Sequence, residues 1–178
     1  MTRSSSFQSV NQSRFLIIGY GNELRGDDAV GPRVAEIVAN WHLPSIKTIS
    51  VHQLTPELVN DIALTDYVIF VDACSDSRCA RTVQLDPIVV GNHSTRTLAA
   101  QDTHTYNPLT LLNLAQQLYE RKPQAWFLQV PIESVEFGKE LSSTTKRGCD
   151  QAVRTIEQFL RTYQKPTQME QALCMKSA

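Results

Sequence analysis

Short apolar runs alternate with amphipathic stretches along the middle of the chain, and this alternation predicts strands and helices in turn. The apolar runs predict strands at residues 14–19, 46–51, 67–71 and 125–130, with a further strand at 81–85. The runs RFLIIG at 14–19 and YVIFV at 67–71 are almost wholly apolar, which is typical of strands covered on both faces.

Helices are expected between these strands, because apolar residues there recur at helical spacing. The first begins near Gly31-Pro32, since proline is tolerated at the first helical position. A short helix follows Thr55, and a longer one begins at Asn107-Pro108. The apolar stripes of the first, third and last helices are Val30, Val34, Ile37, Val38 and Trp41; Leu111, Leu114, Ala115 and Leu118; and Val153, Ile156, Leu160 and Tyr163.

Strands that alternate with helices predict one α/β domain, in which a mostly parallel sheet carries helices on both faces. We expect this domain to span residues 14–163, between a flexible N-terminal tail at 1–13 and a weakly ordered C-terminal tail at 164–178. Ligands of such open sheets bind beyond the carboxyl ends of the strands. The loops that follow Gly19 and Val71 are therefore the first places to look for a site.

Composition and charge exclude several classes of function. The 178 residues include 17 basic and 18 acidic side chains, which give a formal net charge of -1 without a long run of either sign. This balance argues against binding of nucleic acid and against a polybasic membrane contact. No apolar run is long enough to cross a bilayer, and the polar N-terminus lacks the hydrophobic core of a secretion signal. The four cysteines lack the CxxC pairs of a structural zinc site, so we expect reduced thiols in a cytoplasmic protein.

The loop GYGNELRGDDAVGP, residues 19–32, begins like a dinucleotide-binding turn but departs from it. The third glycine of G-x-G-x-x-G is replaced by Leu24, and Asp27 and Asp28 would repel a pyrophosphate. The phosphate-binding pattern G-x-x-x-x-G-K-[ST] fails too, because Asp27 follows Gly26. We therefore expect no nucleotide cofactor.

Two interpretations of the acidic pair remain open from the residues alone. Asp27 and Asp28 precede a helix and could simply favour its dipole, by about 0.3–1 kcal/mol each. Asp72 favours a second interpretation, because it ends the most apolar strand at the same predicted edge of the sheet, where a carboxylate needs a partner. Two acids at this edge, together with the imidazole of His104 just before the Asn107 helix, would form an O,O,N site suited to a divalent transition metal.

Four segments of the chain resemble the maturation endopeptidases of nickel-iron hydrogenases, over roughly residues 15–163. GYGNELRGDDAVGPRVAE is similar to the family's G-x-G-N-x-L-x-x-D-[DE]-G-x-G opening, and YVIFVDA is similar to its strand that ends in Asp-Ala. THTYNPLTLLNLA resembles the family's histidine before a leucine-rich helix, and VPIESVEFGKELS resembles the segment before its last helix. Four ordered matches are specific, whereas any one alone would be weak.

This resemblance implies a fold, a reaction and a set of site residues. The family's fold is a three-layer α/β/α sandwich around a twisted, mostly parallel sheet, of the phosphorylase/hydrolase-like kind. Its members are cytoplasmic and remove a C-terminal extension from the hydrogenase large-subunit precursor after nickel insertion. The metal-contacting residues fall on Asp28, Asp72 and His104, with the nickel carried by the substrate. Some members carry glutamate where this chain has Asp28, and Ala29 replaces a common glycine.

The resemblance leaves the route of hydrolysis open. Nickel could polarise the scissile carbonyl or activate a water molecule, and Asp72 could alternatively act as a general base. Two other functions remain alternatives. One is a nickel-sensing chaperone of the large subunit that does not cut, and the other is a small-molecule hydrolase on a similar fold. We expect a monomer, because the protein has to engage a large partner.

Overall fold

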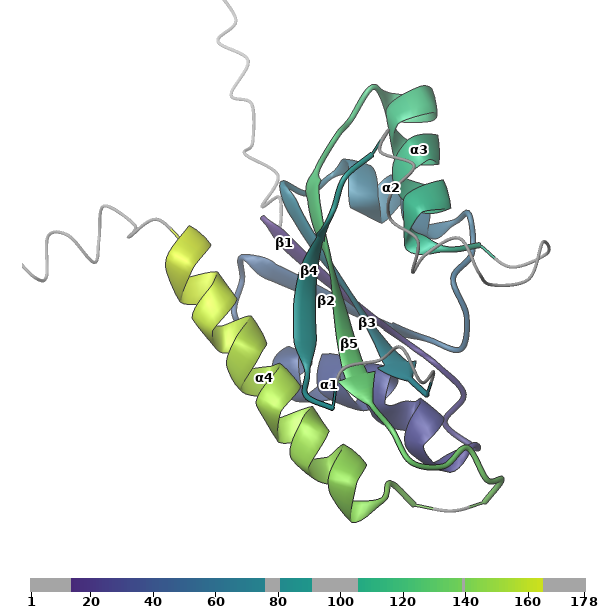
Figure 1. Cartoon of the computed structure of the whole chain (residues 1–178). Coiled ribbons are helices and arrows are strands. Elements are labelled where there is room, and N and C mark those ends of the chain that lie inside the picture. The colour runs from purple at the N-terminus through teal and green to yellow at the C-terminus, as the bar shows by residue number, and fades with distance from the viewer. Residues whose placement is uncertain (1–13, 76–80, 91–105, 139, 165–178) are drawn as a thin grey trace, which may run out of the picture.

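The computed structural model describes residues 14–75, 81–90, 106–138 and 140–164, so both expected tails lie outside the described residues apart from residue 164. Its helices and strands follow one another along the chain as shown in Figure 1. They are β1 (Phe15–Tyr20), the 3-10 helix η1 (Gly26–Ala29), α1 (Val30–Ala39), β2 (Ile46–Val51), α2 (Leu58–Ala63), β3 (Tyr67–Cys74), β4 (Gln84–Ile88), α3 (Pro108–Tyr119), β5 (Gln124–Pro131) and α4 (Ser143–Tyr163).

The five strands form one sheet in the order β2-β1-β3-β5-β4. All neighbours pair in parallel except β4, which runs antiparallel to β5 at the edge. In the register of β1 and β3, Phe15 lies beside Tyr67 and Gly19 beside Val71. β1 therefore ends beside Asp72, whereas β3 continues to Cys74, three residues beyond the strand expected at 67–71. The predicted mostly parallel α/β sheet is confirmed.

Helices cover both faces of the sheet, which makes three layers (Figure 1). Alternate residues of β1 point to opposite faces, as the two-residue period of a strand requires. Leu16 and Ile18 pack in the core that contains α2 and α3, whereas Phe15 and Ile17 pack in the core that contains α1 and α4. This double burial explains why β1 and the first part of β3 are apolar at nearly every position.

Three details differ from the sequence-based expectations. The β4 strand begins three residues later than expected. The helix α4 begins at Ser143, well before the first residue of its expected apolar stripe, Val153, and the Ser142 hydroxyl caps it by accepting from the Thr145 amide at 3.2 Å. Leu118 is exposed, although it was placed on an apolar stripe, because burial along α3 ends at Ala115, one turn before the helix ends. No helix among the described residues combines the length and apolarity needed to span a membrane.

Close packing between α1 and the sheet depends on Gly31. A Cβ atom at this position would lie 2.3 Å from the Tyr20 carbonyl oxygen and 2.6 Å from the Val71 carbonyl oxygen. Gly19 on β1 also has no room for a side chain, since a Cβ atom added there would lie 2.0 Å from the Gly31 carbonyl oxygen. The beginning of α1 therefore rests directly on the backbone at the ends of β1 and β3.

We expect Gly31→Ala to lower the free energy of unfolding by about 1–3 kcal/mol, because backbone atoms would have to move. Gly148 in α4 is a matched control, since a Cβ there meets the Val130 Cγ1 atom at 2.8 Å, and that side chain can adjust. Alanine also favours a helix over glycine by about 0.5–1 kcal/mol. Denaturant unfolding should show Gly148→Ala close to the parent protein, and equal losses in both variants would contradict the argument.

Candidate functional site

Two of the three predicted site residues lie at the carboxyl edge of the sheet. Asp72 is near the end of β3, and Asp28 lies in η1, which follows the loop after β1. The negative charge of Asp28 is close enough to raise the pKa of Asp72. The fold therefore brings Asp28 and Asp72 together, although 44 positions separate them in the sequence.

A tight loop holds Asp28. Its Oδ2 atom accepts a hydrogen bond from the Asn22 amide at 2.8 Å. Gly21 has a φ of +145°, and a Cβ there would lie 2.0 Å from the Asp28 carbonyl oxygen, so only glycine allows this closure. The carboxylate of Asp28 is half-buried, which leaves part of it accessible to a ligand.

Asp72 is nearly enclosed, with 8% of its surface exposed. Burial raises its pKa from 3.8 to about 7, the negative charge of Asp28 adds to this rise, and hydrogen bonds from Tyr20 and the Ala73 amide oppose it. The Ala73 amide lies 2.8 Å from Asp72 Oδ1. In the metal-free protein Asp72 therefore changes its protonation near neutral pH, which suits a group that binds a cation or moves a proton.

Tyr20 is a site residue that the sequence analysis missed. It is the last residue of β1, and its hydroxyl donates a hydrogen bond to Asp72. Burial and the charge of Asp72 both raise the pKa of Tyr20, so the phenol stays protonated. The available signal was its position: Tyr20 and Asp72 each come one residue after Gly19 and Val71, which are paired in the parallel register.

His104 lies outside the described residues, so its position relative to the two acids stays a prediction. Within the described ranges, no three histidine, cysteine, aspartate or glutamate side chains are grouped closely enough to hold a metal ion. The described part of the site thus supplies two carboxylates, Asp28 and Asp72.

Asp27 has a different role from its neighbour. Its carboxylate is 1% exposed and accepts four hydrogen bonds, from the amides of Glu133, Ser134 and Ser142 and from the Ser142 hydroxyl, at 2.6–3.1 Å. Burial would raise the pKa of Asp27, but these hydrogen bonds outweigh it and the pKa is lowered. Asp27 therefore joins the loop that carries Asp28 to the segment before α4, a contact that the helix-dipole interpretation did not foresee.

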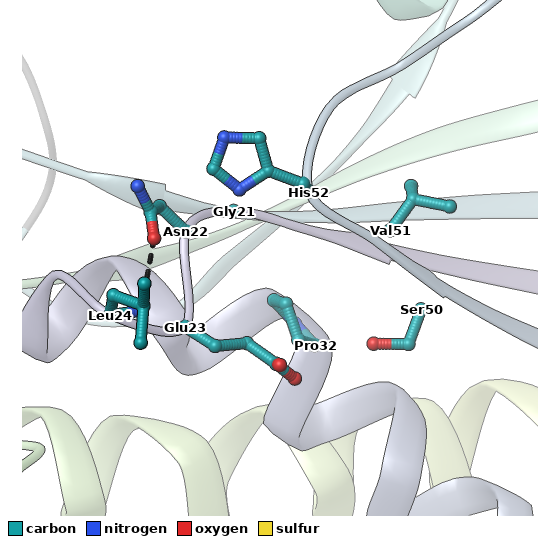
Figure 2. Close-up of a pocket in the computed structure, with 8 residues that line it drawn as sticks. All are labelled: Gly21, Asn22, Glu23, Leu24, Pro32, Ser50, Val51 and His52. Carbon is teal, nitrogen blue, oxygen red and sulfur yellow. Dashed lines mark hydrogen bonds between the residues drawn. The ribbon is translucent and has the colours of Figure 1, made fainter.

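A hollow of about 290 Å³ lies beside the Asp28 loop. Figure 2 shows its lining, which comes from the loop after β1, from α1 and from the end of the neighbouring strand β2. Residues 21–24 form one side together with Pro32, and residues 50–52 at the end of β2 form the other. The Asn22 side chain, whose Oδ1 accepts from the Leu24 amide at 2.9 Å, holds the first side in shape (Figure 2). Asp28 does not line this hollow, but its carboxylate accepts from the amide of Asn22, which does.

The cysteines differ from the expectation of reduced thiols. Cys74, half-buried at the end of β3, is disulfide-bonded, so the expectation is wrong for this residue. Cys149 is a free thiol buried in the core between α4 and the sheet, as expected.

Comparisons with known proteins show where this architecture occurs. No protein-family model matches the sequence, and no curated protein sequence matches it significantly. Several solved structures are similar over most of the chain. The [NiFe] hydrogenase maturation protease HycI from Thermococcus kodakarensis KOD1 is 23% identical, with 84% of this chain and 93% of that chain covered and a TM-score of 0.65.

Two further structures show the same likeness. The hydrogenase maturating endopeptidase HybD from E. coli is 23% identical, with 84% of this chain and 93% of that chain covered and a TM-score of 0.66. The [NiFe] hydrogenase maturation protease HybD from Thermococcus kodakarensis is 24% identical, with coverage of 82% and 98% and a TM-score of 0.60. At these identities the likeness is one of fold. The chain therefore has the α/β/α fold of these hydrogenase maturation proteases.

Proposed function

We propose that this protein is an endopeptidase that removes the C-terminal extension of a nickel-iron hydrogenase large-subunit precursor after nickel insertion. The observation that carries the proposal is the pair Asp28 and Asp72, at one edge of a fold shared with solved hydrogenase maturation proteases. The four sequence segments that resemble the family support it independently of the fold. The pair comes from two of these segments.

The donor set fits nickel that arrives with the substrate. Two carboxylates that repel one another, one of them buried with a raised pKa, gain from a divalent cation placed between them. In this proposal His104 supplies the third ligand, because imidazole suits nickel better than it suits magnesium or calcium. Nickel bound at this position would polarise the scissile carbonyl or lower the pKa of a water molecule.

Tyr20 and Asp72 define what the protein itself contributes. The Tyr20 hydroxyl holds the Asp72 carboxyl in place, and the raised pKa of Asp72 enables it to accept a proton near neutral pH. The backbone of the Asn22 loop orients Asp28 in the same way. A monomer located in the cytoplasm, with no bound nucleic acid and no membrane contact, is the simplest form for an enzyme that processes a folded precursor.

The intact mass of a nickel-loaded large-subunit precursor, before and after incubation with the protein, tests this function. We expect loss of a C-terminal peptide with the parent protein, and no loss with Asp28→Ala or with a nickel-free precursor. Asp86→Ala is the matched control, because Asp86 is exposed on the edge strand β4. Nickel-dependent cleavage that survives Asp28→Ala would remove the acid pair from the mechanism.

The two alternative functions give different results in the same experiment. Nickel-dependent association with the precursor, without any change in mass, would support the chaperone and contradict the endopeptidase. Hydrolysis of a small substrate that is unaffected by Asp28→Ala or His104→Ala would support a different hydrolase on this fold.

A further inference from the structure

Three large apolar side chains are exposed on two loops at the site edge of the sheet. Phe137 is 74% exposed, more than any other large apolar side chain among the described residues, and Leu24 and Val135 are 62% and 42% exposed. Single exposed apolar residues are normal on protein surfaces. Several on one continuous surface mark a place where another molecule binds.

Hydrogen bonds join the two loops into one surface. The Gly138 amide donates to the Leu24 carbonyl oxygen at 2.9 Å, and the Asp27 amide donates to the Ser134 carbonyl oxygen at 3.1 Å. The Asp27 carboxylate adds its bonds to the amides of Glu133 and Ser134. These contacts hold the loop that contains Leu24 against the one that contains Val135 and Phe137.

The same surface is continuous with the candidate site. Leu24 lines the hollow beside the Asp28 loop, and its amide donates to the Asn22 side chain. The Asn22 amide in turn donates to the Asp28 carboxylate. Figure 2 shows Leu24 and Asn22 together on one side of the hollow. A polypeptide that lies in the hollow therefore contacts Leu24 in the same loop that holds Asp28.

We propose that Leu24, Val135 and Phe137, named here the apolar rim, form a docking surface for the protein substrate that is processed at Asp28 and Asp72. The occupant is a protein segment that presents apolar side chains next to the bond to be cut. This inference rests on the proposed function, and it adds where the substrate is recognised. Burial of these exposed side chains stabilises the complex by removing apolar surface from water.

The test compares a double variant of the rim, Leu24→Gln with Phe137→Gln, with Leu118→Gln. Leu118 is 67% exposed in the last turn of α3, which lies before β5 begins and so at the opposite edge of the sheet. We expect KM for the nickel-loaded precursor to rise at least about tenfold in the double variant, because each side chain loses part of its burial energy. The kcat value should stay within about twofold, and Leu118→Gln should match the parent protein.

Each outcome decides the inference. A parent-like KM in the double variant would overturn the rim and leave the proposed function intact. If the parent protein does not cleave, the dissociation constant of its complex with the precursor is measured instead. A dissociation constant about tenfold higher in the double variant supports the apolar rim. No binding by the parent protein, or equal binding by both proteins, overturns it. Phe137→Gln alone, at the more exposed position, provides a folded variant if the double variant unfolds.

Discussion

Asp72→Asn is expected to slow cleavage of the precursor at least about 100-fold and, at the same time, to stabilise the metal-free protein above neutral pH. The carboxyl group of Asp72 is buried, and its pKa is raised from 3.8 to about 7 by burial and by the charge of Asp28. The folded protein therefore holds a proton on Asp72 at pH values where the unfolded chain has lost it. An asparagine imitates the protonated carboxyl group, with one acceptor oxygen and one donor group, and it never becomes charged.

The sign of the pH dependence follows from the raised pKa. Well below pH 3.8 the group is protonated in both the folded and the unfolded states, so its ionisation does not affect stability. As the pH rises from 3.8 to about 7 the unfolded chain loses this proton first, so Asp72 increasingly destabilises the fold. The gain in unfolding free energy from Asp72→Asn should therefore grow with pH and reach about 2–4 kcal/mol at pH 8.

Denaturant unfolding of the metal-free protein at several pH values between 4 and 8 measures this gain. Asp86→Asn removes a carboxylate from an exposed position on β4 and should change stability by less than about 0.5 kcal/mol at every pH. The cleavage rate of Asp72→Asn should fall at least about 100-fold, which is a typical loss for a group that takes part in proton transfer. A gain in unfolding free energy that does not depend on pH would show that ionisation of the Asp72 carboxyl group does not destabilise the fold.

Asp27→Asn is expected to have the opposite effect on stability. The carboxylate of Asp27 accepts hydrogen bonds on both oxygen atoms, from the amides of Glu133 and Ser134 on Oδ2 and from the Ser142 amide on Oδ1. An asparagine has to turn its NH₂ group toward one of these amides, so at least one buried donor loses its acceptor. We expect the free energy of unfolding to fall by about 2–4 kcal/mol and Tm to fall by roughly 5–15 °C.

The pH dependence of stability distinguishes the effect of Asp27→Asn from that of Asp72→Asn. Hydrogen bonds lower the pKa of Asp27 despite its burial, so its stabilising contribution is present above about pH 4 and is lost only as the pH falls further. The loss caused by Asp27→Asn should thus be constant between pH 5 and 8, where the effect of Asp72→Asn changes. Thermal unfolding followed by circular dichroism measures both, with Asp86→Asn as the common control. Parent-like stability of Asp27→Asn would contradict the proposed joining of the two loops.

Much of the fold follows from local patterns in the sequence. The runs RFLIIG and YVIFV predict strands covered on both faces, because a continuous apolar run leaves no face for water and these runs are short and bounded by polar residues. The pair Asn107-Pro108 begins α3 as expected, with the Asn107 side chain accepting from the Thr110 amide at 2.9 Å. The exposure of Leu118 was not foreseeable in this way, since a helical stripe does not say where packing stops.

The candidate site also has features that follow from local sequence and features that depend on the tertiary structure. By itself the sequence determined that Asp28 and Asp72 each come directly or shortly after an apolar run, because these positions along the chain are local. Only the tertiary structure decided that Asp27, adjacent to Asp28, is turned toward Ser142, and that Tyr20 bonds Asp72. Such contacts join residues far apart in the sequence, and their energies depend on burial and on which donors meet which acceptors. A side chain's environment is a property of the folded chain, and this is why two adjacent aspartates of the same chemistry have different roles.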